Sequence, residues 1–168
     1  ITLCEAVAED LLKLRPDIRY KVLPHPLYSH FGAKKSRMEA EDRLGLEHGK
    51  KNILFFGLIR EYKGLDIIIA GEPYGSFEKY EKMIETSGKE RIHTYLHYIK
   101  DSEVSDYFSA ADVAVLPYRS ATQSGISSVS YHFEVPMIVT DTGGLKETIG
   151  EKGTGLVAPE ISADAVKA

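Results

Sequence analysis

The sequence predicts an α/β fold, namely a doubly wound parallel sheet with helices on both faces. Two observations carry this prediction. Short runs rich in Val, Ile and Leu alternate along the chain with segments in which apolar residues recur at helical spacing. These short runs are almost continuously apolar, which is typical of parallel strands that are buried on both faces. The length of 168 residues fits a single domain, 1–168.

The amino-terminal part of the chain predicts two helices and two strands. In the first helix, Val7, Leu11 and Leu14 share one face, and the helix ends before Arg15-Pro16 because the residue preceding proline disfavours helical geometry. The predicted elements are, in order, the helix 5–14, the strand 19–24, a connection marked by proline and glycine over 25–32, the helix 35–46 and the strand 52–56.

The alternation of strands and helices continues through the rest of the chain. In the helix 102–112, Val104, Tyr107 and Phe108 lie on one face, and Asp101 or Ser102 is available to cap the first turn. The predicted strands are 67–71, 91–98, 112–116 and 136–140, and the predicted helices are 77–84, 102–112, a helix that buries Ile126, Val129 and Phe133, and a short helix over 143–150.

One connection in this topology is too short. A crossover between neighbouring parallel strands needs about a dozen residues or more. Only the nine residues 58–66 separate Gly57 from the strand 67–71, and they include a charged loop. We therefore expect that the printed sequence lacks a crossover helix between Asp66 and about Ile68.

The stretch LPYRSATQSGISS, residues 116–128, leads from an apolar strand into a helix through small hydroxyl residues and one glycine. In open α/β sheets, ligands bind outside the carboxyl ends of the strands, which is where this loop is expected. Ser124 can cap the helix and Gly125 lets the backbone approach a ligand, so the free amides of the helix start favour an anion. An ordinary helix cap, which every helix needs, is the alternative.

Two cations in the loop GLIREYKG strengthen the case for a phosphate ligand. Arg60 and Lys63 closely follow the end of the strand 52–56. Two cations on the rim of the sheet beside a helix start suit a diphosphate better than a neutral ligand. A solvated charged loop is the alternative here. The tract TDTGGL, residues 140–145, adds a glycine-rich turn, which alone is a weak signal.

The composition argues against nucleic acid and metal. The formal net charge is -4 at pH 7 and the isoelectric point is near 5.9, whereas recognition of a phosphate backbone needs a basic face. Cys4 is the only cysteine, which excludes an internal disulfide and a multi-cysteine zinc cluster. His93 and His97 lack a third ligand or a carboxylate partner, so no metal site is expected.

Several other classes lose their main support in the sequence. It contains no Gly-x-x-x-x-Gly-Lys-Ser/Thr loop, no Gly-x-Gly-x-x-Gly and no Gly-x-Ser-x-Gly, which disfavours GTPases, nicotinamide enzymes and α/β-hydrolases. No apolar run approaches the ~20 residues of a membrane span. The chain begins with ITLCEAVAEDLL, which carries acids where a signal peptide carries bases, so a cytoplasmic location is expected.

Five segments, taken in order, resemble the carboxyl-terminal domain of the group 1 (family 4) glycosyltransferases. They are FFGLIREYKGLD, IIIAGEPYG, the pattern from Tyr98 to Tyr118, EVPMIVTDTGGLKETI and GTGLV, and the resemblance covers about residues 1–159. It implies the GT-B architecture, in which two Rossmann-like domains face each other across a cleft and the second binds a nucleotide sugar. It also implies that residues 1–22 are the end of a preceding acceptor domain and the segment leading out of it, and that this fragment alone is inactive.

The resemblance also implies roles for particular residues. The family usually has a basic residue directly after the strand-end glycine Gly57, where this chain has Leu58, so Arg60 is expected to supply the charge. Lys63 is expected to contact the diphosphate, and Gln123 or Ser124 to orient the sugar. By the same resemblance the amides of Ser124, Gly125 and Ile126 hold the distal phosphate and sugar, and the turn at Tyr98 and Ile99 meets the base.

One departure from the family leaves the function open. Many members carry two glutamates eight positions apart, where this chain has Ala121 and Val129.

The leading hypothesis is that the chain is the donor domain of a hexosyltransferase-like enzyme. It would move a glycosyl group from a nucleoside-diphosphate sugar to a saccharide or lipid-linked acceptor, with retention and without a metal or other cofactor. Through the missing domain, such an enzyme can sit peripherally at the inner face of the membrane. The alternatives are a non-catalytic nucleotide or sugar-phosphate binding module and a flavodoxin-like signalling or interaction domain. The last is disfavoured because a receiver needs an acidic cluster at its strand ends.

Overall fold

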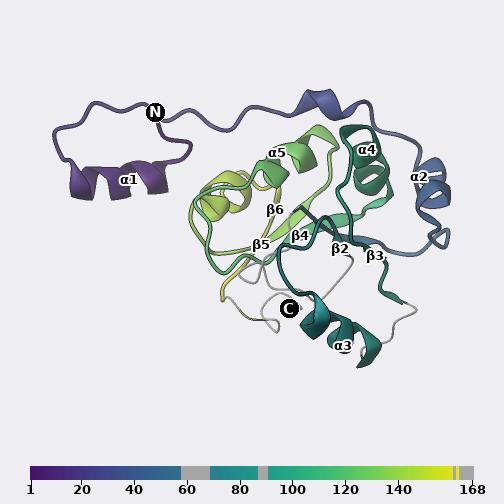
Figure 1. Cartoon of the computed structure of the whole chain (residues 1–168). Helices are drawn as coiled ribbons and strands as arrows, with labels where there is room; N and C mark the ends of the chain where they lie inside the picture. Colours follow the sequence, from purple (N-terminus) through teal and green to yellow (C-terminus); the bar gives the residue numbers. More distant parts are fainter. Residues whose placement is uncertain (58–68, 87–90, 161, 163–168) are drawn as a thin grey trace.

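The sheet has the strand order of a doubly wound α/β fold (Figure 1). The computed structural model describes residues 1–57, 69–86, 91–160 and 162. Within this part, six parallel strands pair in the order β3-β2-β1-β4-β5-β6. Their bounds are β1 Ile53–Phe56, β2 Ile69–Ala70, β3 Thr94–Tyr95, β4 Val113–Leu116, β5 Met137–Thr140 and β6 Gly155–Ala158. The predicted fold class, a Rossmann-like parallel sheet, is confirmed.

The helices occupy the predicted positions with some changes at their ends. They are α1 Glu5–Leu14, α2 Arg37–Leu44, α3 Glu78–Thr86, α4 Asp101–Ala110 and α5 Gly125–His132, with a short 3₁₀ helix η1 at Ser29–Phe31 and a π-helix η4 at Lys146–Gly150. The predicted strand 91–98 shortens to β3. The crossover from β1 to β2 runs through residues 58–68, which lie outside the described residues, so the expected missing helix stays a prediction.

The predicted cap of α4 was wrong. Neither Asp101 nor Ser102 caps the helix, because it already begins at Asp101 and Lys100 is the N-cap residue. The carboxylate of Glu103 accepts a hydrogen bond of 2.9 Å from the Lys100 amide, and the Glu103 amide donates to the Lys100 carbonyl at 2.8 Å. This reciprocal pair at the helix start replaces the expected hydroxyl or carboxylate cap.

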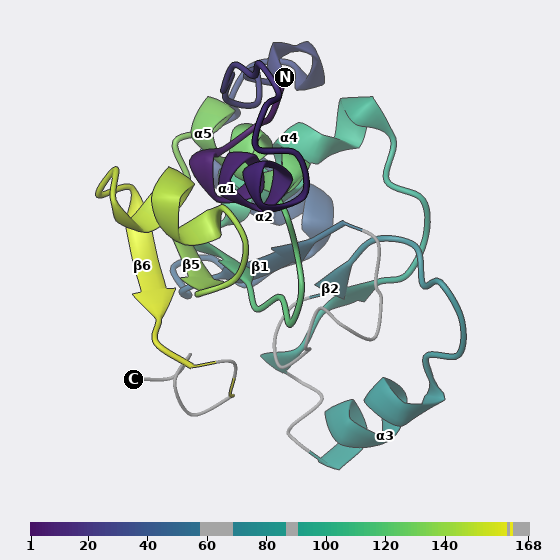
Figure 2. The ribbon, with the colours of Figure 1, turned by 90° about the vertical axis from the view of Figure 1, so that its left-hand side faces the viewer.

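Helices cover both faces of the sheet. In β1, Leu54 and Phe56 point into the main core, which α4 and α5 complete, whereas Phe55 joins a small cluster with Phe77 of the segment leading into α3. Figure 2 shows α4 and α5 on one side of the sheet and α3 on the other. The main core includes Phe108 stacked on Phe133, with ring centroids 5.5 Å apart and both side chains fully buried. The predicted apolar faces of α4 and α5 are thus confirmed.

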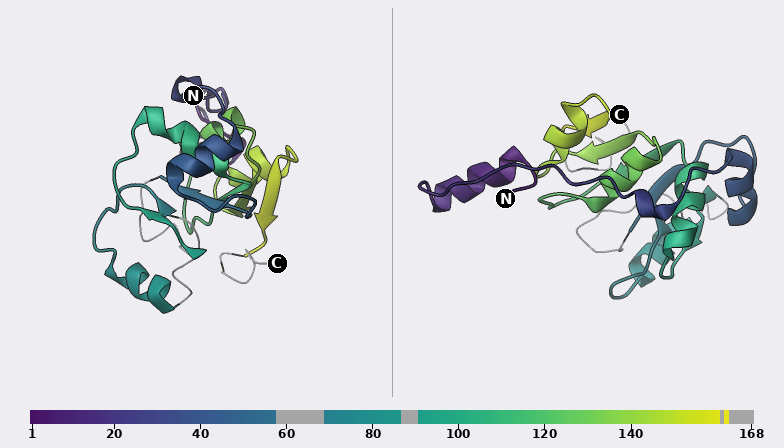
Figure 3. Two further views of the ribbon diagram at one scale, coloured as in Figure 1. Left: turned by 90° about the vertical axis from the view of Figure 1, so that its right-hand side faces the viewer. Right: turned by 90° about the horizontal axis from the view of Figure 1, so that it is seen from above.

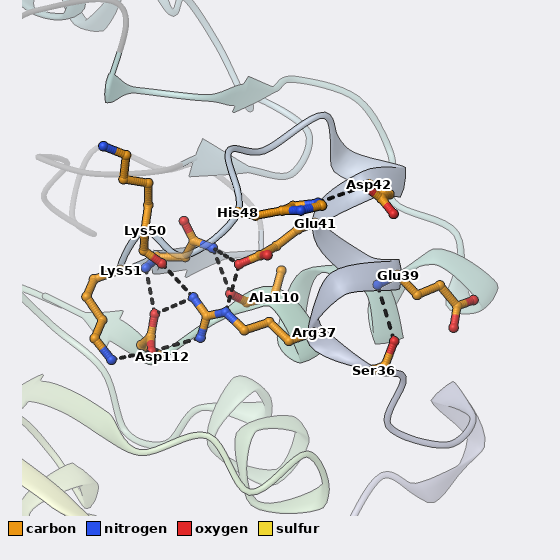
Figure 4. Close-up of polar contacts among 11 residues, drawn as sticks. Ser36, Arg37, Glu39, Glu41, Asp42, His48, Lys50, Lys51, Ala110 and Asp112 are labelled. Atoms are coloured by element: carbon orange, nitrogen blue, oxygen red, sulfur yellow. Dashed lines mark hydrogen bonds and ion pairs between the residues drawn. The ribbon is translucent and has the colours of Figure 1, made fainter.

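A polar network joins α2 to the amino ends of the two central strands (Figure 4). Asp112, directly before β4, accepts hydrogen bonds from Arg37 at 2.9 and 2.8 Å, from the Asn52 amide at 2.7 Å and from Lys51 at 3.1 Å. The buried carboxylate of Glu41 accepts from Arg37 Nε at 2.7 Å. The Arg37 guanidinium, which donates two of these hydrogen bonds, holds the pKa of Asp112 well below its usual range. The network fixes the register in which β1 and β4 begin.

Ion pairs neutralise the five cations of two short basic segments, residues 34–37 and 50–51. Each of these cations has an acidic partner, so the two segments do not form the basic face that a nucleic-acid backbone needs. The pairs are Lys34 with Glu134, Lys35 with Asp106, Arg37 with Glu41 and Asp112, Lys50 with Glu47, and Lys51 with Asp112.

The first 23 residues form a unit of their own outside the sheet. The segments at Thr2 and Val22 pair in parallel, with the Thr2 amide donating to the Lys21 carbonyl at 3.0 Å, and α1 connects them. Figures 1 and 3 show this β-α-β unit, called the N-terminal unit below, projecting beyond the sheet. Of the predicted apolar face of α1, Leu11 is half-buried but Leu14 is 81% exposed. The predicted strand 19–24 is reduced to this single bridge.

Substituting Asp112→Asn should lower the free energy of unfolding at pH 7 by about 2–3 kcal/mol, because three donors lose a charged acceptor. Folding lowers the pKa of Asp112, so its contribution is full above the unfolded value of ~3.9 and is lost as the pH falls below it. Urea denaturation of both proteins between pH 7 and pH 3 measures this. Asp42→Asn, which removes an exposed pair with His48, is the control and should change stability by less than about 0.5 kcal/mol. An equal effect of the two substitutions would contradict the prediction.

Candidate functional site

The two central strands define the site. β1 and β4 pair directly, Ile53 with Val113 and Leu54 with Ala114. From this pair the chain winds outward in both directions, from β1 to β2 and from β4 to β5. Loops that leave neighbouring strands in opposite directions create a crevice outside their carboxyl ends, which is where ligands bind in such folds. We therefore expect the crevice here between Gly57, which follows β1, and the β4–α5 loop, residues 117–124.

Two glycines bring the backbones together on the β1 side of this crevice. The Gly57 amide donates to the Ala70 carbonyl at 3.0 Å, so the pairing of β1 and β2 extends to the sheet rim. Gly71 has φ +148°, and a Cβ at this position would lie 2.1 Å from the Gly57 carbonyl oxygen. Only glycine fits there. The predicted site residue Gly57 therefore lies at the rim, where no side chain of Gly57 or Gly71 fills the space.

Helix α5 begins at the other side of the crevice. The predicted cap is confirmed, since Ser124 is the N-cap residue and its Oγ accepts from the Ile126 amide at 3.3 Å. The Ser124 hydroxyl also pairs with Tyr118 Oη at 3.1 Å and is buried. The helix start is thus held rigidly, and its dipole places positive potential at the crevice.

The space beside Gly125 is partly occupied by the side chain of Tyr28. A Cβ at Gly125 would lie 3.2 Å from the ring of Tyr28, whose hydroxyl pairs with His25 Nε2 at 3.1 Å. The small residue therefore lets the segment after the N-terminal unit pack on the first turn of α5. The sequence suggested room for a ligand, and the structure shows room for Tyr28.

Gln123 is bound to the N-terminal unit. Its Nε2 donates to the Leu3 carbonyl at 3.0 Å. The neighbouring Thr122 carbonyl accepts from the Gly144 amide at 2.9 Å, which ties the β4–α5 loop to the loop after β5. Gly143 has φ +53° and comes so close to Ala121 that a Cβ would lie 1.9 Å from its carbonyl oxygen. The Gly-Gly turn, a weak signal in the sequence, is thus a packed part of the rim.

The remaining predicted residues have different outcomes. Tyr98, after β3, is 67% exposed, but the side chain of Ile99 is buried in the main core. Arg60 and Lys63 lie outside the described residues, so their roles stay predictions. The strand that precedes them, β1, is the direct neighbour of β4, which leads into Ser124. The topology therefore brings the origins of the two predicted halves of the site side by side.

The two positions where the family often has glutamate are apolar and packed. Val129 is buried in α5, and Ala121 packs against the main core. Within the described ranges, no group of three or more His, Cys, Asp or Glu side chains is placed to hold a metal ion. The polar groups that these elements offer a ligand are backbone amides and hydroxyls.

Sequence reasoning missed Glu147. This side chain lies in η4, and its carboxylate accepts from the Glu5 amide at 3.1 and 3.0 Å and from the Ala6 amide at 3.3 Å. It therefore caps α1 from a position 142 residues away along the chain. Such a long-range cap leaves no local signal in the sequence.

The described residues form a six-stranded parallel sheet with a capped helix start at its switch point, which places this chain in the Rossmann-like class of doubly wound α/β domains. The family model of the glycosyl transferases group 1 matches residues 56–168, and the chain belongs to this family. This confirms the resemblance seen in the sequence. None of the helices in the described ranges is long and apolar enough to cross a membrane.

Known proteins agree with this family. The chain is 27% identical to spore coat protein SA of Bacillus subtilis (strain 168), in an alignment that covers 79% of this chain and 41% of that protein. It is also 27% identical to the lipopolysaccharide core biosynthesis mannosyltransferase LpsB of Rhizobium meliloti (strain 1021), covering 79% of this chain and 43% of that protein. The crystal structure of Anabaena Alr3699/HepE in complex with UDP has the same fold, with a TM-score of 0.71, 12% identity, and coverage of 98% of this chain and 51% of that chain. The chain thus spans about two fifths to one half of these proteins.

Substituting Gly71→Ala should destabilise the rim, because the new Cβ would meet the Gly57 carbonyl. We expect the free energy of unfolding to fall by about 1–3 kcal/mol more than for Gly75→Ala. Gly75 also has a positive φ, but a Cβ there meets nothing within 4 Å, so this control isolates the collision. Urea denaturation measures the difference, and equal losses for the two variants would contradict the close approach.

Proposed function

We propose that this chain is the donor domain of a glycosyltransferase that binds a nucleoside-diphosphate sugar at the crevice between β1 and β4. The start of α5 at this crevice is the observation that carries the proposal. Its cap residue Ser124 is fixed by two hydrogen bonds, from Ile126 and with Tyr118, so the start of α5 is held in place and its dipole favours an anion. A helix start that is already fixed needs no rearrangement when a diphosphate leaves.

The cations Arg60 and Lys63 complete the diphosphate site in this proposal. They belong to the loop that follows β1, next to the strand that leads to α5. Together with the helix start they neutralise the charge that develops on the departing diphosphate, which is the role of a divalent cation in other enzymes. The reaction then proceeds with retention, as the family resemblance implies.

Tyr98 is our candidate for the base, since its ring is 67% exposed at the carboxyl end of β3. Ile99 can contribute only through its backbone, because its side chain is in the core. The buried apolar side chain of Val129 cannot bind the ribose hydroxyls. The side-chain amide of Gln123 already donates a hydrogen bond to the Leu3 carbonyl. Orientation of the sugar is therefore assigned to Ser124 and the first turn of α5. With these roles, the affinity for the donor would come more from contacts with the diphosphate than from contacts with the ribose.

The N-terminal unit supports the proposal that a further domain contacts this chain. It exposes large apolar side chains, which are normally covered in a folded protein when they lie together. These are Ile1, Leu3, Leu14, Ile18, Tyr20 and Leu23, between 36% and 84% exposed. We propose that an acceptor domain packs here, closes over the donor and binds a saccharide or lipid-linked acceptor at the cytoplasmic side of a membrane.

A non-catalytic nucleotide or sugar-phosphate binding module is the second candidate. It is favoured by Ala121 and Val129, which leave the two glutamate positions of the family without a carboxylate. The two candidates share the diphosphate site and differ in turnover. Glycosyl transfer by the full-length protein would exclude the module, and saturable binding without transfer would favour it.

Calorimetric titration of this chain with UDP, ADP and GDP tests the diphosphate site. We expect one of them to bind with a dissociation constant between micromolar and millimolar, and the corresponding nucleoside to bind far more weakly. The amides and cations recognise the diphosphate, so its removal takes away most of the charged contacts. No heat with any of the three nucleotides would contradict the proposed function.

Substituting Lys63→Ala should weaken binding of that nucleoside diphosphate by about 1.5–3 kcal/mol, the usual value of a charged hydrogen bond. The dissociation constant should then rise by about one to two orders of magnitude. Lys79→Ala is the control, because Lys79 is an exposed cation of α3. Equal affinities of the Lys63 variant and the unaltered chain would remove Lys63 from the site.

A further inference from the structure

The N-terminal unit is fastened to the rim loops at its first turn. Gln123 Nε2 donates to the Leu3 carbonyl at 3.0 Å. Cys4 is fully buried, with its Sγ 3.9 Å from the Thr122 carbonyl oxygen. Gly144 makes room for it, since a Cβ at Gly144 would lie 2.5 Å from Cys4 Sγ. Residues 3 and 4 therefore sit between the β4–α5 loop and the loop after β5.

Glu147 completes this attachment with a charge. The N-cap residue of α1, Cys4, makes no side-chain cap hydrogen bond. The Glu147 carboxylate caps the helix in its place by accepting from the Glu5 and Ala6 amides at 3.0–3.3 Å. A carboxylate at a helix amino terminus is favoured by the helix dipole and by charge-assisted hydrogen bonds. The cap of α1 is thus supplied by η4, which follows the Gly143-Gly144 turn in the sequence.

The two loops that hold the N-terminal unit also lead into the site. The Gly144 amide donates to the Thr122 carbonyl at 2.9 Å, and Ala121 touches Gly143. Gln123 directly precedes Ser124, the cap residue of α5. Because these contacts are packed with no free space at either glycine, a shift of α1 must move the β4–α5 loop and the first turn of α5.

We propose that Glu147 is a positioning residue of the ligand site. By capping α1 it holds the N-terminal unit against the β4–α5 loop and so keeps the start of α5, from Ser124 to Ile126, in the arrangement that receives a diphosphate. Glu147 itself touches no ligand in this scheme. The inference rests on the proposed function, and it adds a residue that links the donor site to the unit on which a second domain would pack.

The coupling between α1 docking and ligand binding must be reciprocal, because both are equilibria of the same protein. If docking of α1 raises the affinity for a diphosphate, the diphosphate stabilises the docking of α1 by the same factor. A cap with a purely structural role would act differently. Its loss would lower the free energy of unfolding, but the protein that remains folded would bind the ligand with unchanged affinity.

The test uses the nucleoside diphosphate that binds in the calorimetric panel, with UDP as the first probe. We expect Glu147→Ala to raise its dissociation constant about five- to fiftyfold at a temperature where the variant is folded. Glu147→Gln should have a smaller effect, because the amide oxygen can still accept one of the hydrogen bonds. Glu151→Gln, at the end of the same π-helix and exposed, is the matched control and should bind like the unaltered chain.

Amide hydrogen exchange provides the second readout and needs no variant. In the unaltered chain, UDP should slow exchange of the Glu5 and Ala6 amides more than exchange of the amides of α2, which lies at the other end of the strands. Two outcomes would overturn the inference and leave the proposed function standing. One is that the dissociation constants of all variants lie within twofold of that of the unaltered chain, and the other is that bound UDP does not change the exchange rates of the Glu5 and Ala6 amides. If no nucleoside diphosphate binds the unaltered chain, the proposed function fails and the inference fails with it.

Discussion

The parallel pairing of β1 with β4 is the constraint on which the rest of this structure depends. These strands are neighbours in the sheet although almost sixty residues separate them, as the pairing of Ile53 with Val113 shows. Asp112 secures the pair at its amino end by binding the Asn52 amide and the Arg37 guanidinium. The register set there decides which residues emerge at the opposite end, so the structural ion network and the proposed ligand site lie at opposite ends of the same pair of strands.

The sequence was most informative where structure is decided locally or by burial. β4 and β5 are almost continuously apolar, and both strands were predicted correctly. Ser124 caps α5, the helix that follows β4, and this cap was also predicted correctly. Contacts between residues far apart in the sequence could not be predicted. Gln123 or Ser124 was expected to orient the sugar, and nothing in the sequence indicated that Gln123 Nε2 donates to the Leu3 carbonyl. Nothing near Glu147 indicates that it caps α1, because the two helices are far apart in the sequence and meet only through the fold.

The site as described is made largely of backbone. Gly57 and Gly71 bring two chains within contact distance, and α5 presents its first amides beside a buried hydroxyl. Side chains that many family members use, the two glutamates, are replaced by Ala121 and Val129. Under the proposed function, a site of this kind would recognise negative charge by geometry, which is compatible with several sugars and bases. Discrimination between donors would then depend on the periphery of the site, where Tyr98 is exposed.

The N-terminal unit also determines how the chain behaves in isolation. Its two short strands meet through one bridge at Thr2 and Val22, and among the described residues neither has a neighbour on its outer side. Unpaired strand edges flanked by exposed apolar side chains are templates for intermolecular pairing. At high concentration, therefore, two copies of the chain are expected to pair through these edges and to self-associate.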